Sequence, residues 1–259
     1  MSKVEKVFSD NKQSGKETLI GYFPAGYPTV EQSVEACVAM CENGVDVLEI
    51  GVPYSDPVMD GLVIQKATEL ALENGFRLSD IFEIVKQVSA RVDTPLLVMT
   101  YWNPVMQYGV REFAEKLKAS GGSGLITPDL IVDEAKEWLE ISDELGLDRV
   151  FLATPTSTQE RTDSLVSASR GFVYTVSTMG TTGERADLDG KARAVVSKIR
   201  TASDEKFTAV GIGISTRDQV VEVNQYADGA IVGSLFINAF SSGGVQGLID
   251  STRAISNER

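Results

Sequence analysis

The chain has 259 residues, 42% of them hydrophobic, and carries 24 Lys and Arg against 37 Asp and Glu, a formal net charge of −13. A field of this sign repels nucleic acid and anionic membranes, so neither is expected as a partner, although an anionic small molecule can bind where local amide dipoles overcome the global repulsion. The length lies in the range where an α/β barrel forms one domain, and we expect a single domain over residues 1–259.

Short apolar runs rich in β-branched residues alternate with segments of helical period, the pattern of a parallel sheet wrapped by helices. An extra helix is predicted over Lys3 to Lys12, before the first strand. Eight strand units in this length favour a (β/α)8 TIM barrel over an open doubly wound sheet. The predicted strands are Thr18 to Phe23, Asp46 to Gly51, Pro95 to Tyr101, Gly124 to Thr127, Arg149 to Thr154, Phe172 to Ser177, Phe207 to Ile212 and Gly229 to Gly233.

The segment from Val30 to Gly44 illustrates the predicted helices, because Cys37 and Cys41 recur there at helical spacing and Gly44 supplies a stop. These two cysteines are the only ones, and their spacing favours buried thiols facing the core over a disulfide. The glycine-rich stretches Ser120 to Gly124 and Ser241 to Gly247 are predicted as connections between elements. No apolar run is long enough for a membrane span, and the N-terminus is charged rather than signal-like, so a cytoplasmic protein is expected.

The stretch EIGVPYSDPVMDG, from Glu49 to Gly61, places two carboxylates around a loop that directly follows a buried strand. The chain has no histidine, so proton transfer near neutral pH falls to carboxylates, Tyr, Lys or Cys, and Glu49 and Asp60 are the leading candidates. If Leu48 and Ile50 face the helices, Glu49 points into the barrel near the strand ends, where burial raises its pKa. The alternative is structural: Asp60 caps the next helix and Glu49 is a hydrogen-bonded buried carboxylate.

Glycine-rich segments follow the last three predicted strands: MGTTGER (Met179 to Arg185), GIGIST (Gly211 to Thr216) and VGSLF (Val232 to Phe236). Loops at these positions of a barrel, together with the start of a short helix, commonly cradle a phosphate on backbone amides. Any one cluster alone would favour tight barrel turns, but three on adjacent strands favour the phosphate site. GIGIST also resembles half of a dinucleotide fingerprint, but it lacks the third glycine, and that signal is weak.

The residue types limit the chemistry. A metal aldolase would use imidazole ligands, which the chain does not have, and no metal site is expected. Schiff-base catalysis needs a lysine at a strand end, whereas Lys66, Lys116 and Lys198 fall in helical segments. Metal-free acid and base catalysis by Glu49 and Asp60 on a phosphorylated substrate remains.

Further motifs extend along nearly the whole chain. They are GYFPAGYP (Gly21 to Pro28), EIGVPYSDPVMDG, MTYWNPVMQYG (Met99 to Gly109), GLITPDL (Gly124 to Leu130), the MGTTGER loop, GIGIST and the final VGS. Together they closely resemble the alpha subunit family of tryptophan synthase. The resemblance implies a (β/α)8 barrel that cleaves indole-3-glycerol phosphate by retro-aldol chemistry into indole and glyceraldehyde 3-phosphate, in the last steps of L-tryptophan biosynthesis.

Carried over by position, the resemblance makes Glu49 the general acid and base that serves indole C3 and the glycerol hydroxyl, and Asp60 its partner at the indole nitrogen. Thr182 lies where the family's mobile loop contacts Asp60 on closing. The residues implied to bind substrate are Tyr22, Met99, Tyr101, Tyr174, Thr182, Gly183, Gly211, Ile212, Gly213, Gly233 and Ser234.

The resemblance also implies a beta subunit that receives the indole and carries pyridoxal phosphate, in a heterotetramer of two alpha and two beta chains, with no cofactor in this chain. The face presented to that partner includes the loops around Pro53, Asp56 and Asn103. Two alternatives are kept. A stand-alone indole-releasing lyase would share every motif, and a catalytically weak subunit would mainly bind and switch the beta partner. Intact Glu49 and Asp60 argue against the second.

Three positions depart from the commoner family pattern. Thr178 stands where many members have arginine, Leu62 where proline usually follows the Asp-Gly pair, and Ile212 where an aromatic residue is common. The catalytic candidates are unaffected, so the same reaction is expected, with loop closure or partner coupling as the properties that these departures would alter.

Overall fold

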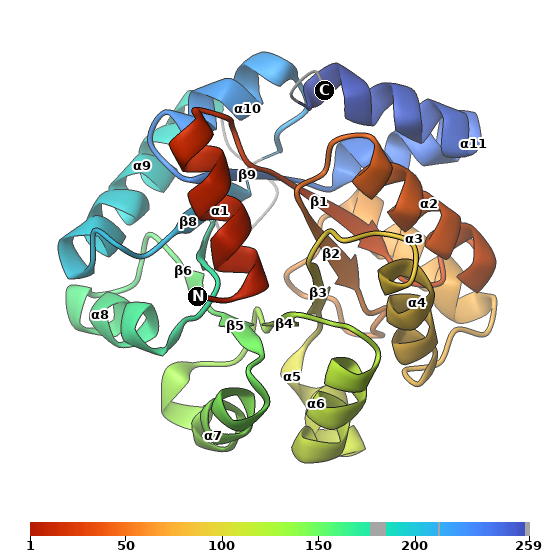
Figure 1. Ribbon diagram of the computed structural model, residues 1–259, viewed down its shortest axis with the longest axis horizontal. Coiled ribbons are helices and arrows are strands. Elements are labelled where there is room, and N and C mark those ends of the chain that lie inside the picture. Colours follow the sequence, from red (N-terminus) through yellow and green to blue (C-terminus); the bar gives the residue numbers. More distant parts are fainter. Residues whose placement is uncertain (177–184, 212, 257–259) are drawn as a thin grey trace.

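Parallel strands and helices alternate along the chain in the computed structural model, which describes residues 1–176, 185–211 and 213–256 (Figure 1). The predicted strands are all found, with ends displaced by one or two residues. Their bounds are β1 (Leu19–Pro24), β2 (Val47–Gly51), β3 (Leu96–Met99), β4 (Gly124–Ile126), β5 (Asp148–Val150), β6 (Leu152–Ala153), β7 (Val173–Val176), β8 (Thr208–Gly211) and β9 (Gly229–Val232).

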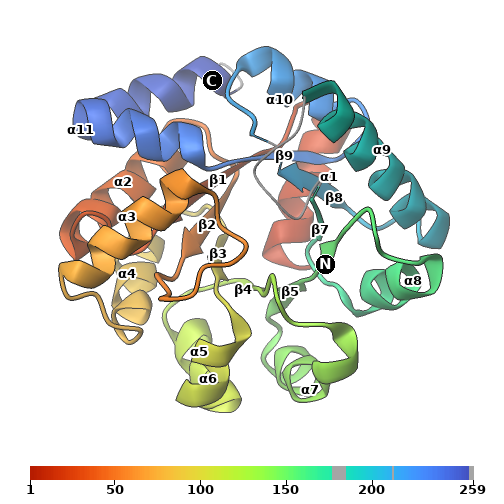
Figure 2. The same cartoon turned by 180° about the vertical axis from the view of Figure 1, so that it is seen from behind.

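Helices surround these strands on all sides in the two opposite views of the barrel (Figures 1 and 2). Their bounds are α1 (Lys3–Ser14), α2 (Val30–Glu42), α3 (Leu62–Glu73), α4 (Asp80–Ser89), α5 (Trp102–Tyr108), α6 (Val110–Ala119), the 3-10 turn η1 (Val132–Glu134), α7 (Lys136–Leu145), α8 (Gln159–Ala168), α9 (Arg185–Ala202), α10 (Arg217–Asn224) and α11 (Ser234–Ile255). Among the described residues, no helix combines the length and the apolar character that a membrane span requires.

The strands form one parallel sheet in the order β5-β4-β3-β2-β1-β9-β8-β7-β6. Its two ends, β5 and β6, are separated in the chain by Phe151 alone, so the sheet closes on itself as the predicted TIM barrel. The predicted strand Arg149 to Thr154 is interrupted at Phe151, between β5 and β6, and Arg149 also forms an isolated antiparallel bridge with Arg170. Beyond the interruption the pairing resumes, since the Tyr174 amide donates to the Phe151 carbonyl at 3.0 Å.

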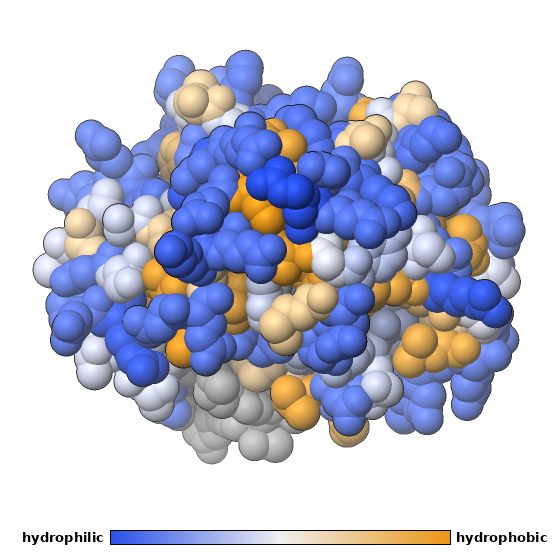
Figure 3. All heavy atoms as spheres, turned by 90° about the horizontal axis from the view of Figure 1, so that it is seen from below, coloured by the Kyte–Doolittle hydropathy of each residue, from blue (hydrophilic) through white to orange (hydrophobic). Residues whose placement is uncertain are grey.

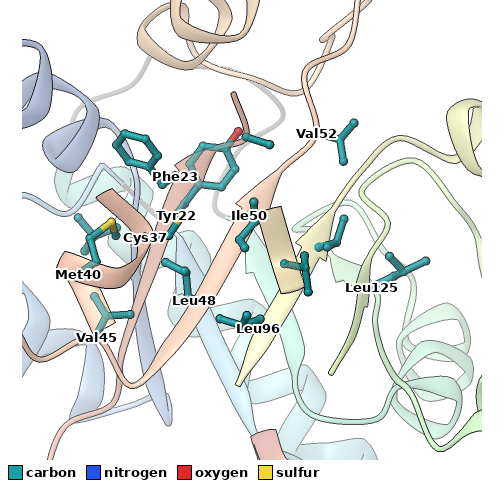
Figure 4. Packing of buried hydrophobic residues seen from close by; sticks show 14 of the residues in the cluster. Tyr22, Phe23, Cys37, Met40, Val45, Leu48, Ile50, Val52, Leu96 and Leu125 are labelled. Carbon is teal, nitrogen blue, oxygen red and sulfur yellow. The ribbon is translucent and has the colours of Figure 1, made fainter. Parts of the chain in front are cut away.

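The barrel interior and the helix layer are two separate apolar clusters, as strand alternation requires. Val47 belongs to the interior cluster, whereas Leu48 and Ile50 belong to the larger cluster under the helices. Figure 4 shows Leu48 beside Met40 and Val45, on the helix side of β2. The interior cluster on the strands consists of Ile20, Val47, Leu97, Ile126, Val150, Phe172, Ala209 and Ile231.

The predicted extra helix, α1, lies across the end of the barrel where the strands begin (Figure 1). Ser2 caps it in a capping box with Glu5, and Phe8, 1% exposed, joins the interior cluster. The Phe8 ring lies 5.2 Å from Phe207 and 5.5 Å from Phe172, centroid to centroid. This end of the barrel is therefore filled by apolar packing, which leaves the opposite end for a site.

Cys37 and Cys41 are buried thiols on α2, as predicted. The Ser120 to Gly124 stretch connects α6 to β4, also as predicted. The Ser241 to Gly247 stretch lies within the bounds of α11, which consists of two helical segments that meet at a kink at Gly244, with φ 59° and ψ −152°. Glycine tolerates this positive φ, so the stretch contains the predicted connection, between the two segments of α11.

Figure 3 shows the side of the molecule on which α6 and α7 lie. Hydrophilic residues cover most of it, with smaller apolar areas between them, as a net charge of −13 would suggest.

Candidate active site

Glu49 points into the barrel from the middle of β2, where it pairs in register with Tyr22 on β1 and with Leu97 on β3. Its side chain is fully buried, and within the described residues neither carboxyl oxygen has a hydrogen-bond partner. Burial raises the pKa of Glu49 from its ordinary value of 4.5 to about 8. The group is therefore a neutral acid at pH 7 with an uncommitted proton. This does not fit the alternative of a hydrogen-bonded structural carboxylate.

Asp60 lies at the end of the loop that leaves β2, one residue before Gly61 begins the turn into α3. Burial raises the pKa of its carboxyl from 3.8 to about 6. The N-cap of α3 is Gly61, which makes no side-chain cap bond, so the capping position that the structural alternative gave to Asp60 belongs to its neighbour. At pH 7 Asp60 is ionised while Glu49 is protonated.

Tyr22 and Tyr174 connect the two acids. Burial raises the pKa of Tyr22, and the charges of Asp60 and Glu49 raise it further. Burial and the same two carboxyls also raise the pKa of Tyr174. Both tyrosines thus lie within electrostatic range of both acids. Figure 4 shows the Tyr22 ring pointing toward the end at which the strands finish.

Glycines at the strand ends make room for these rings. A Cβ atom on Gly51 would lie 2.1 Å from Tyr22 Oη, and one on Gly211 would lie 2.7 Å from Tyr174 Oη. Gly233 also borders Tyr22, with a built Cβ 3.3 Å from the ring. Gly211 was predicted to bind substrate and Gly233 to bind its phosphate, and the structure adds a packing reason for both glycines. The sequence did not predict that position 51 needs a glycine. The only indication was that Gly51 follows Glu49 by two residues and so faces the barrel interior as well.

Gly213, Gly233 and Ser234 have the features that an anion-binding corner needs. Gly213 has a positive φ of 45° with open space around it. Gly233 is the N-cap of α11 without a side-chain cap bond, and Ser234, exposed, is the first residue of that helix. Uncapped amides at a helix start favour an anion. Thr182, Gly183 and Ile212, also predicted for the site, lie outside the described residues, as does Thr178.

Met99 ends β3 and packs, partly buried, against the interior cluster. Tyr101, predicted at the end of the same strand, instead lies two residues beyond it, at the N-cap of α5. Its Oη accepts a hydrogen bond of 2.8 Å from the Met59 amide, next to Asp60. Tyr101 thus joins the site through the Asp60 loop, a contact between residues 42 positions apart that no sequence pattern signalled.

Two cavities in the described part of the chain, of about 430 and 390 Å³, lie elsewhere. The first is lined by Asp46 and Pro95, which precede β2 and β3, and the second by Thr18 and Asp228, which precede β1 and β9. Both therefore lie at the end where the strands begin, away from Glu49. No cluster of three or more Cys, Asp or Glu side chains suited to a metal ion occurs within the described residues.

A family model described as "Tryptophan synthase alpha chain" matches residues 8–254. The chain is 57% identical over 245 residues to the tryptophan synthase alpha chain of Leifsonia xyli subsp. xyli, covering 95% of this chain and 94% of that one. It is 48% identical over 257 residues to the alpha chain of Mycobacterium marinum, covering 99% and 93%.

Solved structures agree with these matches. A structure of Mycobacterium tuberculosis tryptophan synthase superposes with a TM-score of 0.93 at 47% identity, over 98% of this chain and 96% of that chain. The tryptophan synthase A-subunit from Pyrococcus furiosus superposes with a TM-score of 0.84 at 36% identity, over 93% and 98%.

Proposed function

The chain belongs to the tryptophan synthase alpha chain family, and from this premise we propose that Glu49 and Asp60 carry its reaction. That reaction is the lyase step of the family, the cleavage of indole-3-glycerol phosphate to indole and glyceraldehyde 3-phosphate in tryptophan biosynthesis. One observation carries the proposal: a fully buried carboxyl without hydrogen-bond partners in the described structure, with its pKa raised to about 8, shares two tyrosine neighbours with a second acid.

In the first step, neutral Glu49 donates its proton to C3 of the indole ring. The ring becomes an iminium cation, with positive charge at its nitrogen. Ionised Asp60 accepts a hydrogen bond from that N–H and opposes the charge, an interaction that is stronger in the transition state than in the ground state. The pKa of about 6 at Asp60 keeps it charged at pH 7, while Glu49 is still an acid.

In the second step, the Glu49 carboxylate takes the proton from the glycerol hydroxyl next to the ring. The carbon–carbon bond breaks, its electron pair returns to the ring as the iminium is neutralised, and the hydroxyl carbon becomes the aldehyde of glyceraldehyde 3-phosphate. Glu49 ends the cycle protonated, as it began. One carboxyl thus serves as acid and then as base, and the proton count closes without a cofactor in the chain.

The substrate is held at both ends. Backbone amides near the start of α11 bind its phosphate, favoured by the uncapped helix end at Gly233. Aromatic and apolar side chains at the strand ends enclose its indole ring. The residues proposed for the phosphate are Gly183, Gly211, Gly213, Gly233 and Ser234, and those for the rest of the substrate are Tyr22, Met99, Tyr101, Tyr174, Thr182 and Ile212.

The chain acts in the cytoplasm as one domain, with a beta subunit that carries pyridoxal phosphate, in a heterotetramer of two alpha and two beta chains. Exposed apolar side chains on the loop after β2 and on α3 and α5 support such a partner: Val58 is 78%, Leu62 67% and Met106 50% exposed. They belong to the same segments as the partner-facing positions Asp56 and Asn103. Apolar side chains gathered on one face are typical of a protein interface.

Indole release from indole-3-glycerol phosphate tests the proposal, measured for the wild type, Glu49→Gln and Asp60→Asn, each with and without a beta subunit. The expected result is release by the wild type, strong activation by the beta subunit, and loss of several orders of magnitude in both variants. Full activity of the wild type alone would support a stand-alone lyase. Activity retained by Glu49→Gln would remove Glu49 from the mechanism.

A further inference from the structure

We infer that Tyr101 is a positioning residue for Asp60. Its hydroxyl accepts a hydrogen bond from the Met59 amide. This bond holds the loop of residues 52–61 in place and so positions the Asp60 carboxylate. The inference rests on the proposed function of Asp60. It assigns the Tyr101 hydroxyl to the loop and leaves the Tyr101 ring as the part proposed to contact substrate.

The loop that carries Asp60 has few ties of its own to the barrel. Residues 52–61 form neither helix nor strand. At its start, the Val52 amide donates to the Met99 carbonyl at 2.9 Å, which continues the pairing of β2 with β3. Near its end, the Met59 amide donates to Tyr101 Oη at 2.8 Å. These two bonds attach both ends of the loop to β3 and the residues that follow it.

Local bonds around Asp60 give the loop its shape but do not fix it to the barrel. The Asp60 amide donates to the Pro57 carbonyl at 3.0 Å, and Gln65 Nε2 donates to the Asp60 carbonyl at 2.8 Å. The partners belong to the loop itself or to α3, the helix that the loop leads into. Of these three bonds near Asp60, only the one from the Met59 amide to Tyr101 connects this end of the loop to a segment outside the loop and α3.

Tyr101 is itself held firmly, as an anchor must be. It is 6% exposed, and its ring lies 5.2 Å from the ring of Tyr54, centroid to centroid. Directly after it, the Trp102 amide donates to both carboxyl oxygens of Asp129, at 2.9 and 3.2 Å. Asn103 Nδ2 donates to Tyr54 Oη at 3.1 Å. The loop after β4 thus holds the residue that follows Tyr101, and the Tyr54 ring packs against the Tyr101 ring itself.

The chemistry of the hydroxyl suits an anchor beside an ionised acid. Burial and the charge of Asp60 raise the pKa of Tyr101, so the phenol is neutral throughout the working pH range. A neutral oxygen can accept from a backbone amide without adding a charge near Asp60. A lysine or arginine in this place would lower the pKa of Asp60, whereas the tyrosine leaves it at about 6.

Tyr101→Phe removes the acceptor and keeps the packed ring, so it isolates the bond. The matched control is Tyr108→Phe, which removes the hydroxyl that accepts from Lys116 Nζ at 2.6 Å, away from the Asp60 loop. Indole release would be measured for both, alone and combined with Asp60→Asn, as kcat and KM over pH 5 to 9, with thermal melting beside it.

Tyr101→Phe is expected to lower kcat roughly 10- to 100-fold with KM within about twofold, because a misplaced catalytic group costs about that much. The low-pH limb of its kcat profile should shift to lower pH, because an Asp60 carboxyl that is less buried has a lower pKa. Tyr108→Phe should match the wild type. In the Asp60→Asn background, Tyr101→Phe should have no further effect.

Several results would overturn the inference. A rise in KM with kcat unchanged would make the Tyr101 hydroxyl a substrate contact, and an unchanged profile would give it no role. An equal loss in the Asp60→Asn background would show that it acts by another route. Full activity of Asp60→Asn alone would instead reject the proposed function of Asp60, a different failure that this design separates.

Discussion

Tyr22 and Glu49 are register partners on β1 and β2, and each stands two residues after an inward-facing residue of its strand, Ile20 or Val47. The buried acid thus has an aromatic residue as its register partner, and neither of its oxygens has a hydrogen-bond partner among the described residues. A ring next to a carboxyl cannot replace the water that ionisation requires, and the pKa of Glu49 is raised to about 8 by this burial. In the proposed function the Tyr22 ring also contacts the indole ring of the substrate. The packing that binds the substrate therefore also contributes to the burial that raises the pKa of Glu49.

The opposite charge states of the two acids predict a bell-shaped pH profile of kcat/KM for the isolated chain. Activity should fall below about pH 6 as Asp60 becomes protonated, and above about pH 8 as Glu49 loses its proton. Asp60→Asn should remove the low-pH limb from its residual activity and keep the high-pH one. Steady-state indole release at fixed ionic strength checks this, and a flat profile from pH 5.5 to 8.5 would contradict the assignment.

Glu49 also predicts a pH-dependent cost in stability. Its pKa is about 8 in the folded chain and near 4.5 when unfolded, so the folded state binds more protons between these values. The free energy of unfolding should therefore fall as pH rises through this window, and the loss should be complete above pH 8. Glu49→Gln cannot ionise. Relative to the wild type, its urea midpoint should rise from pH 5 to pH 8.5, although its activity is lost.

The same comparison contains its control. Glutamine buries an amide in place of a carboxylic acid, which shifts stability by an amount that does not depend on pH, so only the change between the two pH values is informative. Glu35→Gln supplies an exposed match, because its side chain is 54% accessible and pairs with Arg91. A Glu49→Gln difference that stays constant with pH would mean that Glu49 ionises normally in the folded chain.

Strand alternation and the order of elements could be predicted because both follow from local patterns. Eight β-branched runs and their spacing gave the barrel, and the parity of Leu48 and Ile50 gave the inward direction of Glu49. The bridge between Arg149 and Arg170, near the interruption at Phe151, could not be predicted from a local pattern. That pairing joins segments whose approach is set by the closed barrel.

The site contacts that escaped prediction are those between loops or across strands. Tyr101 was assigned to a strand as the last residue of the run PLLVMTY, but the strand ends at Met99 and α5 begins at Trp102. Only the folded chain brings the Tyr101 hydroxyl to the Met59 amide. Likewise, the need for glycine at position 51 depends on where the Tyr22 ring lies on the neighbouring strand.

Gly51→Ala is predicted to damage both stability and activity. The new Cβ would lie 2.1 Å from Tyr22 Oη and 2.5 Å from two ring carbons, so the ring has to move. Overpacking of this kind costs about 1–3 kcal/mol. Because the ring borders Glu49, kcat should fall as well. Tyr22→Phe in the same chain should relieve the strain only in part, since the ring carbons remain.

Gly190→Ala is the matched control, because Gly190 is an exposed residue of α9 with no atom within 4 Å of a built Cβ. Alanine there should stabilise the chain by about 0.5–1 kcal/mol, through helix propensity alone. Chemical denaturation and indole release on both variants measure the contrast. A Gly51→Ala chain as stable and active as the wild type would show that the Tyr22 ring is free to shift.

The N-terminal helix should affect stability but not chemistry. Phe8 is 1% exposed and lies against Phe172 and Phe207 at the end of the barrel remote from Glu49. Phe8→Ala leaves a cavity there and should cost about 3–5 kcal/mol, while kcat below the melting transition stays within about twofold of the wild type.

Lys6→Ala on the same helix removes only an exposed ion pair with Asp10 and should change stability by less than about 1 kcal/mol. Thermal melting and initial rates on the three chains test this. A large fall in kcat for folded Phe8→Ala would mean that the aromatic column from Phe8 through Phe172 to Tyr174, whose last two rings lie 6.4 Å apart, transmits the disturbance to the site.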